Sequence, residues 1–484
     1  MSNLKNKVFS GLIWTYAERF FAQIISLLVT VILARIIAPE EYGIIAIISV
    51  FITIADSFAI NGLGNSLIQK KNADELDFSS VFYFNIFFSI IIYIIFWIFA
   101  VPLAKFYNEQ LLCPVLRVMA IRIPIAAINS VQQAYVSKRM EFRKFFFATI
   151  IGTVISAIVG IAMAYLGYGV WALVAQYLIN TFIDTIILWL TVKWRPRFIY
   201  SWERMKGLFS YGWKVLATSL LITIYSNIQD LIIGKKFSSV DLAYCNKGRQ
   251  FPSLISTNIN TSITKVLFPA ISECQDDRYR VKQMTRKSIS IGTYILAPVL
   301  IGLAAIGDGF IEIILTDKWS GCVPFLRIMC LVYLLQPIQT SSIQAMKAIG
   351  KSDLYLKLEI QKKIFGIGVL AVTVLFFNSV FVIIVGSLIA EIFSTILNIP
   401  YMEKLIDYKV AEQINDIFPS LLMAFIMFLT VYPIHYIKIN IWIKLGLQIL
   451  IGISIYITIS CISKNTNYQY VKKILSTYLK RKKG

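Results

Sequence analysis

Histidine and paired cysteine, which build many catalytic and metal sites, are scarce in this sequence. Its 484 residues include one histidine, His435, and six cysteines with no Cys-x-x-Cys pair. A structural zinc site or a histidine-based catalytic centre is therefore not expected. We expect no metal, no cofactor and no enzymatic activity.

Charge is also scarce. Charged residues make up 15% of the chain and hydrophobic residues 57%, whereas soluble domains are about a quarter charged. About fourteen hydrophobic runs are each long enough to cross a bilayer, which takes roughly 20 residues. The runs are Val8–Ile37, Tyr42–Gln69, Phe78–Phe106, Leu112–Ser137, Phe145–Leu166, Gly169–Val192, Gly207–Gly234, Val240–Ile271, Ser288–Leu315, Cys322–Ile349, Tyr355–Phe377, Val380–Met402, Phe418–Ile437 and Ile441–Ile462. They lack the alternation of barrel strands. The sequence predicts an all-α polytopic membrane protein with about fourteen transmembrane helices.

The charges that are present are mostly basic and are unevenly placed. The formal net charge is +21, and lysines and arginines gather at every second junction between the runs. This distribution follows the positive-inside rule and indicates membrane orientation rather than nucleic-acid binding. It predicts a multi-pass protein with both termini in the cytoplasm.

The chain contains an internal duplication. Cys-Pro-Val-Leu-Arg-Val-Met from Cys113 returns as Val-Pro-Phe-Leu-Arg-Ile-Met from Val323, and Glu41 matches Asp241 at an offset of two hundred. We expect two six-helix lobes, 1–203 and 204–404, in a parallel repeat, because an even number of spans preserves orientation. Residues 405–484 would add a helix pair and a basic cytoplasmic tail.

Several charges lie inside the hydrophobic runs, where each costs about 2.5 to 3.5 kcal/mol on insertion scales. The deeper cations are Arg19, Arg122, Lys214, Lys247 and Arg249. Cations nearer the outer surface, where they could extend to headgroups, are Arg35, Arg117 and Arg327. The interior acids, candidates for pairing with cations or for ion coupling, are Glu18, Asp56, Asp184, Asp230 and Glu391.

This interior favours an anionic ligand. Guanidinium groups match phosphate oxygens in pairs, so a lipid phosphate or pyrophosphate is the expected chemistry. The expected place is near the midplane between the lobes, where repeat transporters bind their substrates. The alternative is that buried acids simply neutralise these cations, and both interpretations can hold together.

Two segments carry a family resemblance. LARIIAPEEYG, residues 33–43, and IIGKKFSSVDLAYCNKGRQ, residues 232–250, resemble Wzx-type polysaccharide flippases of the multidrug, oligosaccharidyl-lipid and polysaccharide (MOP) exporter superfamily. Ala243 stands where the second copy more usually has glycine. The arginine-rich signature of the related lipid II flippases is not found, so their essential arginines cannot be transferred.

The resemblance implies a MATE-like fold and alternating access between two lobes. The substrate would be a polyprenyl-pyrophosphate-linked oligosaccharide, moved from the inner to the outer leaflet of the bacterial plasma (inner) membrane for lipopolysaccharide or other surface polysaccharide assembly. Other implied partners are membrane lipids, a polysaccharide polymerase and chain-length machinery. Transport would be driven by an H⁺ or Na⁺ gradient or by the membrane potential.

The sequence has features that bear on two alternative functions. A cation-coupled multidrug exporter of the same superfamily would rely on cavity carboxylates, whereas this interior has more bases than acids. A membrane glycosyltransferase or polymerase would need a large extramembrane loop with clustered catalytic residues, and neither this nor an Asp-x-Asp motif is found.

Overall fold

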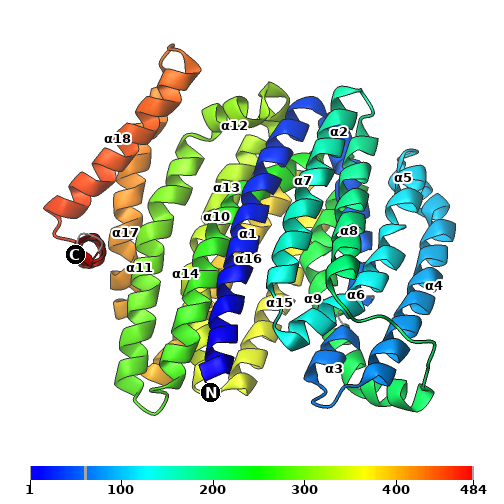
Figure 1. Ribbon diagram of the computed structural model, residues 1–484. Coiled ribbons are helices and arrows are strands. Elements are labelled where there is room, and N and C mark those ends of the chain that lie inside the picture. Colours follow the sequence, from blue (N-terminus) through cyan, green and yellow to red (C-terminus); the bar gives the residue numbers. More distant parts are fainter. Residues whose placement is uncertain (1, 59–62, 482–484) are drawn as a thin grey trace. The chain divides into compact units, whose positions relative to one another are not determined.

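A computed structural model describes residues 2–58 and 63–481 (Figure 1). Every regular element in these two ranges is a helix, and neither range contains a strand. The prediction of an all-α polytopic membrane protein is confirmed. Within the described residues, eleven helices are long and apolar enough to cross a membrane.

Three of the predicted spans are not among those eleven. Tyr42 to Gln69 is divided between two shorter helices, while Val240 to Ile271 and Tyr355 to Phe377 each lie on one long helix. Lys247, Arg249 and Lys265 on the second of these runs lower its hydropathy. The total of about fourteen spans stays a prediction.

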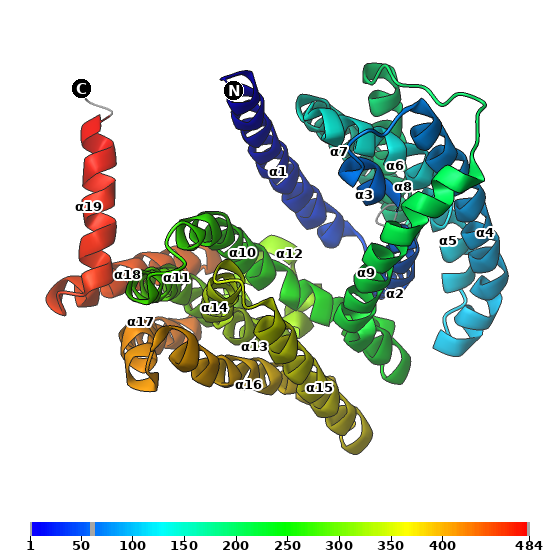
Figure 2. The ribbon, with the colours of Figure 1, turned by 90° about the horizontal axis from the view of Figure 1, so that it is seen from below.

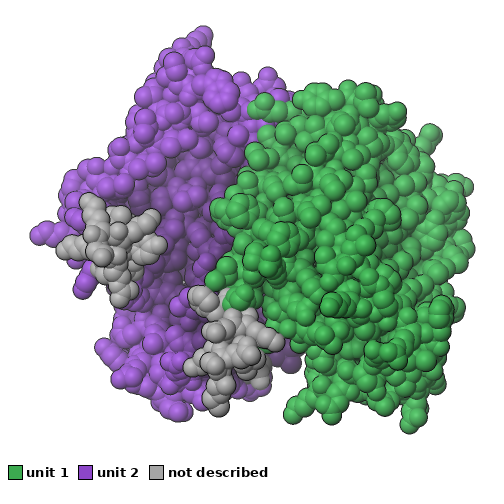
Figure 3. All heavy atoms as spheres, viewed as in Figure 1, with its two compact units in different colours: residues 1–243 green, residues 244–484 purple. Residues whose placement is uncertain are grey.

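The chain divides into two compact units, residues 1–243 and 244–484 (Figure 3). This division falls later than the lobe boundary expected at 203/204. The reason is that α9 (Trp202–Lys236) packs on α2, α3 and α4 and so belongs with the first unit. The division by contacts does not test the repeat of six-helix lobes.

The first unit is built around long packed helices (Figures 1 and 2). α7 packs along α8 and α1, and α6 packs on α4 and α8. Their bounds are α1 Ser2–Ile36, α2 Pro39–Asp56, α3 Leu63–Gln69, α4 Glu75–Tyr107, α5 Leu112–Met119, α6 Arg122–Arg139, α7 Arg143–Tyr165 and α8 Val170–Thr191. An apolar core at one end of this unit joins Phe78, Phe82, Leu188 and Trp194.

The Pro-Glu-Glu-Tyr-Gly motif has a structural role in the first unit. Pro39 begins α2, where a missing N–H costs nothing. The Glu41 carboxylate accepts hydrogen bonds from Val170 N at 2.9 Å and from Ala38 N at 3.4 Å, so it caps the start of α8 as well as its own helix. Gly43 is needed for close approach, since an added Cβ would lie 1.9 Å from the Ser239 carbonyl oxygen.

In the second unit α11 packs on α13, α14 and α17. The helices are α10 Ser239–Ser272, which begins in the first unit, then α11 Arg278–Ala305, α12 Gly307–Leu315, η2 Asp317–Cys322, α13 Val323–Leu334, α14 Gln336–Ala348, α15 Ser352–Phe376, α16 Val380–Ile406, α17 Val410–Val431, η3 Tyr432–Tyr436, α18 Ile441–Ile462 and α19 Thr466–Arg481. Leu358, Met402 and Tyr408 are fully buried in its core.

Two runs expected as single helices are broken, and proline explains both breaks. Leu112 to Ser137 divides into α5 and α6, and Cys322 to Ile349 into η2, α13 and α14. Pro124 and Pro337 have no N–H to donate to the carbonyls four residues earlier. In the second case the freed carbonyl of Tyr333 accepts a hydrogen bond of 3.3 Å from Ser256 Oγ. A side chain from a neighbouring helix thus satisfies the backbone inside the bundle.

Candidate functional site

Arg122 is the best-defined deep cation of the first unit. Its Nη1 lies 2.8 Å from Asp56 Oδ2, and its Nε donates to Thr181 Oγ1 at 2.9 Å. The arginine side chain is 29% exposed and the aspartate 15%. Asp56 Oδ1 is buried and has no hydrogen-bond partner among the described residues. Residues from α2, α6 and α8 therefore form a neutral but partly accessible ion pair inside the helical bundle.

Two further acids of the first unit bind neutral donors. Asn129 Nδ2 donates to Asp184 Oδ2 at 2.7 Å, and Thr149 Oγ1 donates to Glu18 Oε1 at 3.1 Å. Asn129 is buried and Glu18 is partly exposed. These carboxylates sit on α1 and α8, and neither forms an ion pair with any residue that the structure describes. Each is therefore able to accept a cation or a proton. Arg19, next to Glu18, is exposed.

The cations predicted near the outer surface differ in their contacts. Arg117 lies over the Trp97 ring at 4.6 Å, and its Nε donates to the Trp97 carbonyl at 3.2 Å. Arg35 is exposed at the end of α1. Arg327 in the second unit pairs with Asp308, donates to the Ala304 carbonyl at 3.2 Å and lies over Tyr432. Arg117 and Arg327 thus have structural partners at corresponding places of the duplicated motif.

The predicted site residues on α9 and α10 have fewer described contacts. Asp230 is buried with 6% of its surface exposed. Lys247 is equally buried, lying 5.5 Å from the Trp319 ring centre and 3.4 Å from Gln250 Oε1. Arg249, two residues later, is partly exposed. The side chain of Lys214 lies outside the described residues.

A partly buried polar chain in the second unit includes Glu391. Gln339 Nε2 donates to Glu391 Oε1 at 2.7 Å, and Lys362 Nζ donates to Gln339 Oε1 at 3.3 Å. Lys362 is 6% exposed and also lies 3.5 Å from Glu359. α14, α15 and α16 each supply one group. The sequence interpretation included Glu391 but missed its link to Lys362, which depends on the packing of three helices.

An ionic cluster between α11 and α17 was also missed. Arg286 binds both carboxylate oxygens of Asp416, through Nε at 2.7 Å and Nη2 at 2.9 Å, and its Nη1 reaches Glu412 at 2.9 Å. Lys282 lies 2.7 Å from Glu412, and the buried Tyr408 hydroxyl donates to Asp416 at 2.7 Å. Because every charge has an opposite partner, this cluster fastens two helices together.

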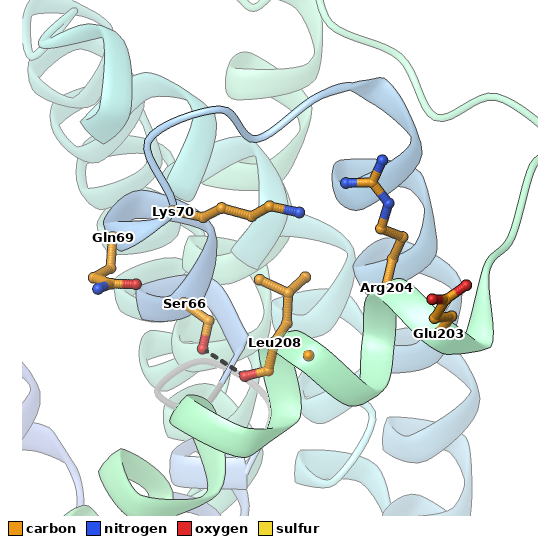
Figure 4. Close-up of a pocket in the computed structure, with 7 residues that line it drawn as sticks. Ser66, Gln69, Lys70, Glu203, Arg204 and Leu208 are labelled. Atoms are coloured by element: carbon orange, nitrogen blue, oxygen red, sulfur yellow. Dashed lines mark hydrogen bonds between the residues drawn. The ribbon is translucent and has the colours of Figure 1, made fainter.

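A cavity of about 670 Å³ in the first unit is lined by residues of α3, by Lys70 just after it and by the start of α9. Figure 4 shows these lining side chains. Lys70 and Arg204 extend along it, and Ser66 donates to the Leu208 carbonyl at 3.2 Å. Both cations are already near the buried Asp77, at 2.6 Å and 3.8 Å. Their pairing makes this cavity a structural junction rather than a vacant anion site.

Asp74 helps to form the same junction, outside the membrane-spanning helices. It is the N-cap of α4, and its carboxylate accepts a hydrogen bond from Asp77 N at 3.0 Å. This hydrogen bond, with nearby Arg204 and Lys70, lowers the pKa of Asp74 from its ordinary value. Across the described residues no group of three or more histidine, cysteine or acidic side chains could hold a metal ion.

Long apolar helices with ion pairs between them define a polytopic helical membrane protein, and solved structures of other membrane proteins share its fold. The chain superimposes on the structure titled lipid II flippase MurJ, inward closed conformation, with a TM-score of 0.74 at 16% identity, covering 93% of this chain and 98% of that one. An inward-facing multidrug resistance MATE family transporter of the MOP superfamily gives 0.61 at 14% identity, covering 82% and 98%.

Residues 32–324 match the model of a family described as polysaccharide biosynthesis protein, and the chain belongs to this family. The succinoglycan biosynthesis transport protein ExoT of Rhizobium meliloti (strain 1021) is 27% identical over 66% of this chain. The chain spans 65% of the length of ExoT. The lipopolysaccharide biosynthesis protein WzxC of Escherichia coli (strain K12) is 22% identical, covering 82% of this chain and 81% of WzxC.

The teichuronic acid biosynthesis protein TuaB of Bacillus subtilis (strain 168) is 24% identical, covering 73% of this chain and 74% of TuaB. The resemblance to polysaccharide flippases of the MOP superfamily, predicted from residues 33–43 and 232–250, is confirmed.

Proposed function

We propose that this protein moves a polyprenyl-pyrophosphate-linked oligosaccharide from the inner to the outer leaflet of the bacterial plasma membrane. The membership of the polysaccharide biosynthesis family supports this function. The relatives support it too, since they are a succinoglycan transport protein and proteins of lipopolysaccharide and teichuronic acid biosynthesis. The oligosaccharide would serve the assembly of a surface polysaccharide.

The structural observation that carries the proposal is the Arg122–Asp56 pair. Its two charges cancel while no substrate is present, so the guanidinium can remain inside the bundle at low cost. A pyrophosphate offers the same planar pairs of oxygens as the carboxylate and carries more negative charge. The substrate would displace Asp56 from part of the guanidinium, and Thr181 would hold Arg122 in place during the exchange.

Coupling to an ion gradient is the second part of the proposal. Glu18, Asp184 and Glu391 accept hydrogen bonds from neutral side chains of Thr149, Asn129 and Gln339. A carboxylate with such partners can be protonated without leaving a buried cation uncompensated. We propose that one or more of these acids takes up H⁺ or Na⁺ during transport, with no further cofactor.

The proposal also includes alternating access, the orientation in the membrane and the proteins that receive the product. The two lobes would expose the site alternately to each side, both termini would be cytoplasmic, and the lipid chain would stay in the bilayer. A polymerase and chain-length machinery would receive the product. Cation-coupled multidrug export is less well supported, because the family match and the curated relatives are polysaccharide proteins.

The test is transport of a fluorescent polyprenyl-pyrophosphate oligosaccharide by the purified full chain in proteoliposomes. We expect movement by the wild type and loss of movement in Arg19→Ala, Arg122→Ala and Arg249→Ala. Arg197→Ala is the matched control, because Arg197 lies on the exposed segment between α8 and α9 and pairs there with Glu75 at the start of α4. If the wild type neither binds nor moves this lipid, the proposed function is wrong; resistance to lipophilic cations on expression would then favour multidrug export.

A further inference from the structure

A second cavity of the first unit, of about 840 Å³, lies between α1, α7 and the end of α8. Its polar lining includes Arg143 and Lys144 at the start of α7 and Glu141 in the preceding turn. Its apolar lining includes Trp14, Phe147 and Ile151. The cavity is therefore basic on one side and apolar on another.

The position of this cavity corresponds to a membrane–water interface. The apolar spans Ile13–Ile36 and Arg143–Tyr165 begin beside it, and Val170–Thr191 ends beside it. Aromatic and basic side chains are the residues that favour this level of a membrane protein. By the orientation proposed above, it is the cytoplasmic interface, whose leaflet carries the anionic lipids.

Arg143 is prepared to bind an anion. Its guanidinium carbon lies 5.4 Å from the Trp14 ring centre and 5.5 Å from that of Phe147, so cation–π contacts with two rings position the group. No hydrogen bond or ion pair of the Arg143 side chain is found with any described residue. Neighbouring Lys144, by contrast, is paired with Glu141 at 2.5 Å. The N–H edge of Arg143 therefore remains available.

The apolar wall extends from this cation into the membrane-spanning part of α7. Phe147 and Ile151 are each 39% exposed, and they follow Arg143 at intervals of four residues on the same face of the helix. This face is suited to one acyl chain. Trp14 on α1 contacts both the cation and Phe147, so a bound lipid would touch both helices.

We propose that this cavity binds one anionic phospholipid, with its phosphate on Arg143 and an acyl chain along Phe147 and Ile151. Two cations and one carboxylate line the mouth, which gives a net positive site and selects against zwitterionic headgroups. The bound lipid would contact α1 and α7 together from the membrane-facing side of the cavity. This goes beyond the proposed transport function, and its test does not depend on transport.

The experiment uses the detergent-purified full chain and native mass spectrometry, with dioleoyl phosphatidylglycerol and dioleoyl phosphatidylcholine as probes. We expect one phosphatidylglycerol molecule to be retained in preference to phosphatidylcholine. Arg143→Gln should weaken this binding about tenfold, the loss typical of one charge-assisted contact. The matched control is Arg139→Gln, because Arg139 lies over Tyr135 and does not line the cavity.

A second variant, Ile151→Trp, fills the apolar wall and should reduce retention of the lipid without changing any charge. Equal binding of the two lipids, or equal effects of Arg143→Gln and Arg139→Gln, would overturn the proposal. Thermal stabilisation of the wild type by inorganic phosphate, matching that by phosphatidylglycerol and unaffected by Ile151→Trp, would also overturn it, since it would show a site for free anions.

Discussion

Arg122 and Asp56 form an ion pair of 2.8 Å between two helices of the first unit, with Thr181 as a third partner of the arginine. Both side chains are mostly shielded, and they come from α6 and α2. The pairing lowers the electrostatic free energy that it costs to bury each charge, and it keeps the guanidinium in a defined orientation. It therefore has a structural role in the absence of substrate, and the proposed function gives it a second role in its presence.

These two roles can be separated by mutation. Arg122→Ala should abolish transport and lower the free energy of unfolding by about 2 kcal/mol, because Asp56 is left without its cation. The double variant Arg122→Gln, Asp56→Asn removes both charges and should recover most of the stability but not the transport. Thermal unfolding and lipid movement in proteoliposomes measure the two effects. Transport by the stable double variant would assign Arg122 a purely structural role.

The sequence could predict the helices, the depth of Arg122 and a set of possible acidic partners, because hydrophobic runs and charges are local features. It could not choose Asp56 for Arg122 or Gln339 for Glu391, since those choices depend on which helices pack together. The breaks after Met119 and Leu334 were also missed. Pro124 and Pro337 were visible, but proline alone does not show whether a membrane helix bends or divides.

The α11–α17 cluster should contribute to stability. Arg286→Gln removes a two-bond contact to Asp416 and one bond to Glu412, so we expect a loss of about 2 kcal/mol. Arg280→Gln is the control, because its pair with Asp277 is local and exposed and should be worth less than about 1 kcal/mol. The melting temperatures of the two variants in detergent test this prediction. Equal melting temperatures would contradict the view that the cluster holds α11 and α17 together.

Gly43 tests the close packing of the first unit. In Gly43→Ala the new methyl group would lie 1.9 Å from the Ser239 carbonyl oxygen, so the backbone must move. We expect a loss of about 2 kcal/mol, as for overpacked sites. Gly207→Ala is the matched control for Gly43→Ala, since no atom lies within 4 Å of its added Cβ. The prediction fails if both alanines leave the melting temperature unchanged.

The lowered pKa of Asp74 should make the stability of the protein depend on pH. This pKa is lowered in the folded protein, chiefly by the hydrogen bond from Asp77 N. The charged cap therefore stabilises the fold above the ordinary pKa of 3.8 and loses this contribution as the pH falls through the lower, folded pKa. Asp74→Asn keeps a good N-cap but does not titrate, so its melting temperature should fall less in acid. Parallel acid titrations of both proteins would show this.

Glu391 is the clearest place to test ion coupling. Its carboxylate binds Gln339, which in turn accepts a hydrogen bond from the buried Lys362. Glu391→Gln preserves the size and most hydrogen bonds of the side chain but cannot take up a proton. If this acid couples transport, the variant should lose at least tenfold in gradient-driven lipid movement, the effect expected when a step worth about 1.4 kcal/mol is removed.

The matched control for Glu391→Gln is Glu403→Gln, an exposed carboxylate on the same helix, α16. Its removal should leave gradient-driven transport unchanged, because the site is solvated. Lipid movement would be measured in proteoliposomes with an imposed pH gradient, an imposed Na⁺ gradient, and neither. Full gradient dependence in Glu391→Gln would exclude this acid from coupling and leave Glu18 and Asp184, which also bind neutral donors, as the remaining candidates.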